Sequence, residues 1–171
     1  MKIFRLMGLP LLVFTAIVVQ RSGVGQATIY GIHPDIVMLM VASIGVYRGR
    51  EIGALSGFFS GLVVDAFLTT PFGISALIYV VVGYLAGELE RIGSTAPLTL
   101  KILTVGVVSI IGEAFSVVIL FLLGLSDPLK ARTIEEVVIV GGVNLLLAPL
   151  ALMLCRLVFG PDDRQTILER R

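Results

Sequence analysis

Six apolar segments, separated by short polar or charged stretches, constrain the fold of this chain more than any other feature. The approximate residue ranges of these segments are 4–19, 34–47, 52–68, 73–87, 98–123 and 137–159. A helix needs about 20 residues to cross a hydrocarbon core roughly 30 Å thick, and helices satisfy their own backbone hydrogen bonds there. The sequence therefore predicts an all-α, polytopic membrane protein. We expect residues 1–171 to form a single domain, a compact bundle of six transmembrane helices.

The composition supports this class. Apolar residues make up 57% of the 171 residues and charged residues only 15%, too few polar side chains for the surface of a soluble domain of this size. The second and fourth segments are short, so we expect them to use flanking residues or to be shielded by neighbouring helices. The first segment could also be interpreted as a signal peptide, but five further apolar segments favour an uncleaved helix.

The distribution of basic residues predicts the orientation. If the N-terminus is cytoplasmic, ten of the thirteen Lys and Arg residues fall on the cytoplasmic side, and three on the opposite side: Arg21, Lys130 and Arg132. Basic residues are enriched in cytoplasmic loops. We therefore expect a multi-pass protein of a cytoplasmic membrane with both termini in the cytoplasm. The stretch 130–136 is expected to be an exposed loop of mixed charge.

Glycines recur at every fourth position from the entry of the third segment onwards, at Gly49, Gly53, Gly57 and Gly61. In a bilayer, small residues at this spacing let two helix backbones approach closely. Successive steps of four residues drift by about 40° around a helix with 3.6 residues per turn, so the stripe can contact two neighbours. Two interpretations of the stripe stay open: it packs against another helix of the same monomer, or it docks a helix of a partner protein.

Three polar side chains lie inside apolar segments: Asp65, Glu113 and Asn144. Each is costly in lipid and calls for an explanation. Counted along their helices at about 1.5 Å per residue, all three fall at a similar depth in the outer half of the membrane. They could form one polar cluster that binds a cation, a solute or a polar residue of a partner. Alternatively, Asp65 is hydrated near the outer interface and a protonated Glu113 bonds Asn144 to hold two helices together.

Signatures of enzymes and of metal sites are missing from the sequence. The chain has one cysteine, Cys155, and one histidine, which is too few for a zinc site. The histidine is distant in sequence from most candidate nucleophiles and stands in no motif of a nucleophilic triad. The glycine stripe has no Lys-Ser/Thr sequence after it, as a phosphate-binding loop would. The net charge of +1 does not indicate nucleic acid as a partner. We expect a protein that is not an enzyme and that uses no cofactor or metal.

Several motifs together resemble the rod-shape-determining MreD family, over roughly residues 30–95. They are a Pro-Asp pair that opens the second segment, the basic and glycine-rich entry to the third, its closing acid Asp65, a Pro-x-Gly turn at Pro71 and Gly73, and a second pair of glycines in the fourth. The resemblance implies a non-enzymatic scaffold of the bacterial inner membrane that regulates cell shape and lateral peptidoglycan synthesis. It also implies partners, namely a bitopic MreC-like protein and, through it, an MreB-like filament and a RodA/penicillin-binding-protein synthase. A homo-oligomer is a further alternative.

The same family is distantly similar to the substrate-binding S-components of energy-coupling-factor vitamin transporters. This similarity implies a compact S-component-like bundle and supplies the alternative function, which is vitamin binding. Such a protein needs a pocket lined by aromatic and hydrogen-bonding side chains. The chain has no Trp and only four Tyr, so the sequence favours the scaffold.

Overall fold

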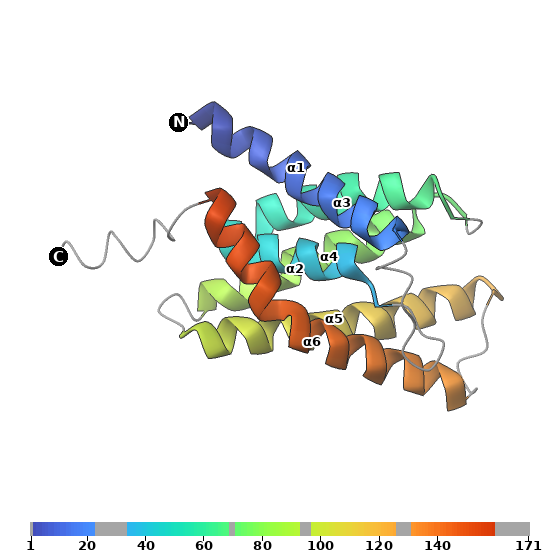
Figure 1. Cartoon of the computed structure of the whole chain (residues 1–171). Coiled ribbons are helices and arrows are strands. Elements are labelled where there is room, and N and C mark those ends of the chain that lie inside the picture. Colours follow the sequence, from blue (N-terminus) through green and yellow to red (C-terminus); the bar gives the residue numbers. More distant parts are fainter. Residues whose placement is uncertain (1, 23–33, 69–70, 93–96, 126–130, 160–171) are drawn as a thin grey trace.

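In the computed structural model, the described residues form a bundle of helices (Figure 1). The structure describes residues 2–22, 34–68, 71–92, 97–125 and 131–159. The helices in these ranges are α1 (Lys2–Arg21), α2 (Ile36–Arg48), α3 (Arg50–Asp65), α4 (Ile74–Ile92), α5 (Leu98–Leu122) and α6 (Ala131–Phe159). Each corresponds to one predicted apolar segment. The all-helical class is therefore confirmed for the described part of the chain.

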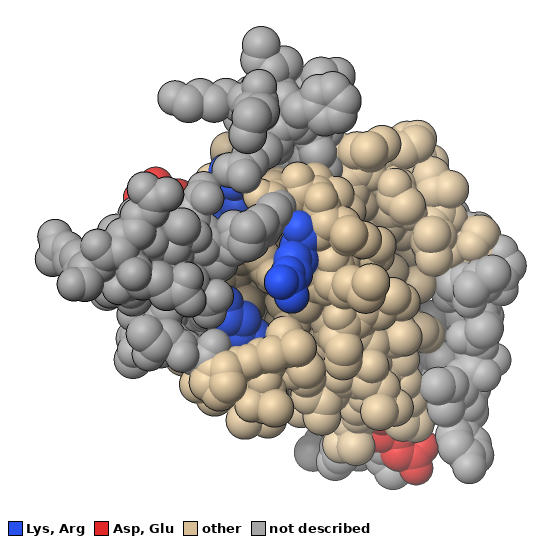
Figure 2. Space-filling model, turned by 60° about the vertical axis from the view of Figure 1, so that its left-hand side comes forward, with Lys and Arg blue, Asp and Glu red and all other residues tan. Residues whose placement is uncertain are grey.

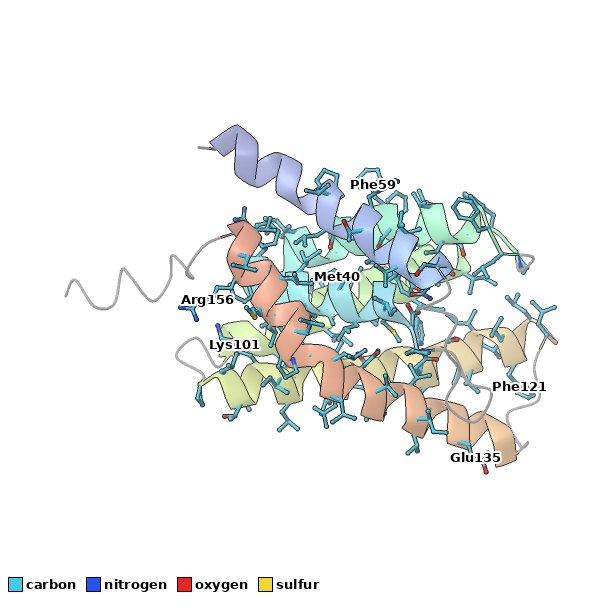
Figure 3. All side chains as sticks on the ribbon, viewed as in Figure 1. Met40, Phe59, Lys101, Phe121, Glu135 and Arg156 are labelled. Atoms are coloured by element: carbon cyan, nitrogen blue, oxygen red, sulfur yellow. The ribbon has the colours of Figure 1, made fainter. Side chains whose placement is uncertain are left out.

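Helix α2 is the centre of the bundle and contacts each of the other five helices. Ten successive residues, 37–46, are buried, and Met40 lies in the middle of the molecule in Figure 3. A helix that is apolar on all sides is the expected core of a helical bundle. At 13 residues it is about 20 Å long, which is short for a membrane span, but its neighbours shield it as the sequence suggested.

Helices α3 and α4 form the most extensive pairing in the structure, and they touch through their backbones. A Cβ atom on Gly57 would collide with the carbonyl oxygen of Tyr79, and one on Gly53 would collide with that of Gly83. The contact is reciprocal, because a Cβ on Gly83 would in turn collide with Gly53. Gly61 meets the backbone of Ala76 in the same way. The two antiparallel helices thus share one long contact made of small residues.

The side chains of α3 are distributed by size. Its buried residues are small or short: Gly53, Ser56, Gly57, Ser60, Gly61, Val64 and Asp65. Its large apolar side chains point outwards, and Figure 3 shows Phe59 on the outer side of the bundle. The two buried serines donate to carbonyl oxygens of their own helix, Ser56 Oγ to Gly53 at 2.8 Å and Ser60 Oγ to Ser56 at 2.7 Å. This arrangement is typical of helices that pack closely in lipid.

In the described part of the chain, two helical stretches are long and apolar enough to cross a membrane, by length and composition: Leu98–Leu122 and Val137–Phe159. Shorter apolar stretches lie at Pro10–Gln20, Ile36–Arg48 and Ile74–Leu89. Large apolar side chains are exposed along α5 and α6, among them Leu122 at 75% and Leu146 at 79%. Such a surface is expected where side chains face lipid.

Helix α6 differs from its prediction at its start and in its middle. The sequence predicts a loop over 130–136, but α6 begins at Ala131, and only Lys130 lies outside the described residues. Glu135 and Glu136 are good helix formers, so the helix continues past the apolar segment. Figure 1 shows a bend in the middle of α6. Pro149 lies inside the helix and explains it, because proline removes one backbone hydrogen bond and clashes with the preceding turn.

The backbone contact predicts that the glycines of α3 tolerate no side chain. Gly57→Ala should destabilise the purified protein by about 1–3 kcal/mol, because the new methyl group overpacks a rigid backbone contact. Thermal unfolding in mild detergent measures this. Gly142→Ala is the matched control, since nothing lies within 4 Å of a Cβ at that position. Equal melting temperatures for the two variants would contradict the contact.

Candidate functional site

Asp65 is the last residue of α3 and it caps the start of α4. Its carboxylate accepts three backbone N–H groups: Oδ2 from Gly73 at 2.9 Å and Ala76 at 3.2 Å, and Oδ1 from Ser75 at 3.0 Å. The side chain is 3% exposed. The first N–H groups of a helix have no partner within it and attract negative charge. Burial of this acid is therefore offset by charge-assisted hydrogen bonds.

The Pro71 and Gly73 turn gives this cap its geometry. Gly73 has a φ of 101°, which is a left-handed conformation that glycine adopts without strain. Pro71 precedes it and has no N–H that needs a partner. Together they reverse the chain so that the N–H of Gly73 and the first turn of α4 face back onto Asp65. The family-like motif of an acid followed by Pro-x-Gly is thus one structural unit.

A second acid, Asp35, caps α2 and connects it to α4. Asp35 Oδ1 accepts the N–H of Met38 at 2.9 Å, and Oδ2 accepts the hydroxyl of Tyr79 at 2.6 Å. Gln20 of α1 adds a further cap, because its Oε1 accepts the N–H of Val37 at 3.0 Å. Three helices therefore meet at the start of α2. This network was not predicted, although the Asp35 position directly before an apolar helix is a signal for an N-cap.

Asn144 of α6 and Ser109 of α5 are fully buried without hydrogen-bond partners in the described part of the chain. Both are 0% exposed, and neither Asn144 Nδ2, Asn144 Oδ1 nor Ser109 Oγ has a partner there. They belong to one helix contact, since a Cβ on Gly106 would meet Leu145 and one on Gly141 would meet Ile110. Unsatisfied buried groups are rare and costly in folded proteins.

The three predicted polar residues therefore have different surroundings. Asp65 uses its carboxylate on the backbone of α4, and Asn144 has no hydrogen bond to either acid. The alternative in which Glu113 bonds Asn144 is not formed either. Glu113 is half-buried on α5. Asp65 does not bond Asn144 because its carboxylate oxygens already accept three N–H groups at the start of α4.

The glycine stripe is covered by the chain itself. Gly53, Gly57 and Gly61 face α4, and a Cβ on Gly53 would also lie only 2.7 Å from the Cα atom of Gly45 in α2. Gly49 ends α2 with a φ of 87° and lies against Gly87 of α4. Of the two interpretations left open by the sequence, these contacts correspond to packing within the monomer.

Side chains that could bind a metal ion are not brought together in the described residues. No set of three His, Cys, Asp or Glu side chains there could hold a metal ion. Cys155 is buried and has no disulfide partner in this part of the chain. Asp35 and Asp65 serve as caps at the N-terminal ends of α2 and α4. The site is therefore a set of structural contacts that fixes α2, α3 and α4 against each other.

Removal of the α4 cap gives a second prediction. Asp65→Ala should lower the free energy of unfolding by about 2 kcal/mol, because three backbone donors lose their acceptor. Asp65→Asn should lie between this variant and the original chain, since the amide keeps one acceptor oxygen. Chemical unfolding in detergent micelles checks the order. A fully stable alanine variant would show that the carboxylate does not hold α4.

The unpaired amide gives a third prediction of the opposite sign. Asn144→Leu should stabilise the protein by about 1–3 kcal/mol, because it replaces a buried amide without partners by an apolar side chain of similar size. Ser109→Ala should have a smaller effect in the same direction. Both are measured as shifts of the thermal unfolding midpoint. Destabilisation by both changes would mean that these groups have polar partners in the membrane.

Comparison with known proteins assigns the family. Residues 1–158 match the family model described as rod shape-determining protein MreD. Searches of curated proteins and of solved structures give no match for this chain. The matched region includes every helix of the described structure except the last residue of α6. The chain therefore belongs to the MreD family of rod shape-determining proteins.

Proposed function

We propose that this protein is a non-enzymatic scaffold subunit of the bacterial cell-elongation complex. In this role it spans the inner membrane six times and binds an MreC-type bitopic protein. Through that partner it regulates lateral peptidoglycan synthesis by an MreB-like filament and a RodA/penicillin-binding-protein synthase. The observation that carries the proposal is the match to the MreD family over residues 1–158, because this family determines rod shape.

The distribution of charge supports the proposed orientation. Lys101 and Arg156 lie at the same end of the bundle in Figure 3, and Glu135 lies at the other end. Arg48 belongs to the first of these ends, because its guanidinium lies over the ring of Phe159. Arg21 ends α1 at the opposite side. With the basic end in the cytoplasm, this arrangement obeys the positive-inside rule.

The partner contact falls on outward-facing side chains in this proposal. The sequence left open a docking role for Gly49, Gly53, Gly57 and Gly61, but α4 occupies that side of α3. A partner helix would instead meet exposed residues such as Phe58 and Phe59, which stack edge to face at 5.6 Å between ring centroids. Aromatic side chains are enriched at protein interfaces.

Vitamin binding is the weaker alternative. A vitamin-binding S-component needs polar side chains that face a pocket. In the described part of this chain, Asp35, Asp65 and Tyr79 are instead bonded to protein groups at the helix ends. This use of the polar residues supports a scaffold whose interior is committed to packing.

Replacement of the native family member in a rod-shaped host tests the proposal. Cells that depend on this chain should keep their rod shape, and cells depleted of it should widen and become round. A tagged copy should co-purify the MreC-type protein from mild detergent, and Gly142→Ala should do so equally. The proposal is wrong if depleted cells stay rod-shaped, or if the purified chain binds a vitamin in native mass spectrometry and no MreC-type protein.

A further inference from the structure

Three basic side chains from three different helices gather at one end of the bundle. Arg48 ends α2, Lys101 lies in the first turn of α5, and Arg156 lies in the last turn of α6. We call these three residues the basic cluster. Figure 2 shows this end of the molecule, where Lys and Arg side chains lie beside uncharged residues of the described part. The helices therefore bring together charges that are far apart in the sequence.

Aromatic rings hold two of the three side chains in place. The Arg48 guanidinium lies 5.0 Å from the centre of the Phe159 ring, and Lys101 Nζ lies 5.5 Å from that of Tyr47. Phe159 is 4% exposed and follows Arg156 by three residues, which is about one helical turn. Lys101 is itself only 7% exposed. Such contacts order long side chains and reduce the entropy lost when they bind a ligand.

Arg50, which is close in sequence to Arg48, differs from the basic cluster because its charge is already paired with a carboxylate. Its guanidinium pairs with Glu88 at 3.0 Å and lies over the Tyr84 ring at 5.8 Å. Within the described ranges, Arg48 and Arg156 have no carboxylate at ion-pair distance. Arg156 is exposed and Arg48 is half-buried. With respect to the described ranges, these two guanidinium groups are therefore available to an outside anion. Lys101 is a third basic side chain at the same end.

The surface beside the basic cluster is apolar. On α5, Leu98 is 59% and Leu103 51% exposed, and on α6, Leu157 is 70% exposed. A ligand that suits both parts has an anionic head and hydrocarbon chains. Free phosphate would leave the apolar part unused, and an acidic peptide of the cytoplasm would not reach along the membrane-facing sides of α5 and α6. Basic sites between transmembrane helices on the cytoplasmic side are suited to anionic lipid head groups.

We propose that the basic cluster is a binding site for an anionic glycerophospholipid of the inner leaflet. Arg48 and Arg156 contact its phosphate, since guanidinium groups bind phosphate oxygens in a fork geometry. The acyl chains lie along the exposed leucines of α5 and α6. The lipid thereby bridges α2, α5 and α6 at their cytoplasmic ends. The inference needs the membrane orientation proposed above, but it is independent of the MreC-type partner.

Native mass spectrometry of the full chain from detergent tests the site. The probes are dioleoylphosphatidylglycerol, dioleoylphosphatidylcholine and inorganic phosphate. We expect selective retention of phosphatidylglycerol and little competition by millimolar phosphate. Arg48→Gln combined with Arg156→Gln should weaken phosphatidylglycerol binding roughly 30-fold, from about fivefold for each basic residue near anionic lipid.

Arg50→Gln is the matched control, because it removes one charge at the same end from a residue already paired with Glu88. It should change lipid binding less than twofold. Helix content and a monodisperse elution profile verify that each variant is folded. The double variant Arg48→Lys, Arg156→Lys keeps both positive charges but removes the fork-shaped guanidinium groups, so it tests whether charge alone is enough. Equal retention of the two lipids, equal losses in the double variant and the control, or displacement by free phosphate would each overturn the proposal.

Discussion

The close contact between the backbones of α3 and α4 is the interaction on which the rest of the structure depends. Glycines on α3 lie against Gly83 and the backbone at Tyr79 without side chains between them. This brings α4 near enough for Asp65 to reach its first N–H groups and for Tyr79 to reach Asp35. In lipid, where apolar burial gives little drive for helix association, such packing and buried hydrogen bonds are the main cohesive terms.

Much of the fold could be predicted from the sequence, because apolar segments in a membrane protein report helices directly. The helix positions agree closely with the six segments. Gly49, which the sequence assigns to the glycine stripe, is the residue at which α2 ends and α3 begins. The start of α6 was missed, since residues 131–136 are polar yet still helical. Hydropathy identifies the lipid-facing part of a helix and does not define where its hydrogen bonding begins.

The polar residues could be found from the sequence, but their partners could not. Asp65 stood out as an acid in an apolar segment, and its depth was similar to that of Asn144. Depth alone does not give the direction of a side chain around a helix. Asp65 points to the α4 backbone, and Asn144 is buried on α6 without a hydrogen-bond partner in the described residues. The match to the MreD family agrees with the motifs that carried the resemblance.

The most direct measurement of the central claim is a contact between α3 and α4 in the membrane-embedded protein. A Cβ on Gly57 would collide with the carbonyl oxygen of Tyr79 and lie 2.8 Å from the amide nitrogen of Val80, so one Hα of Gly57 points at the peptide group between these two residues. Nuclear magnetic resonance of isotope-labelled protein in nanodiscs should show a cross-peak between the Hα protons of Gly57 and the amide proton of Val80. Resolved signals for both residues with no cross-peak between them would mean that the two backbones do not touch, and would contradict the account.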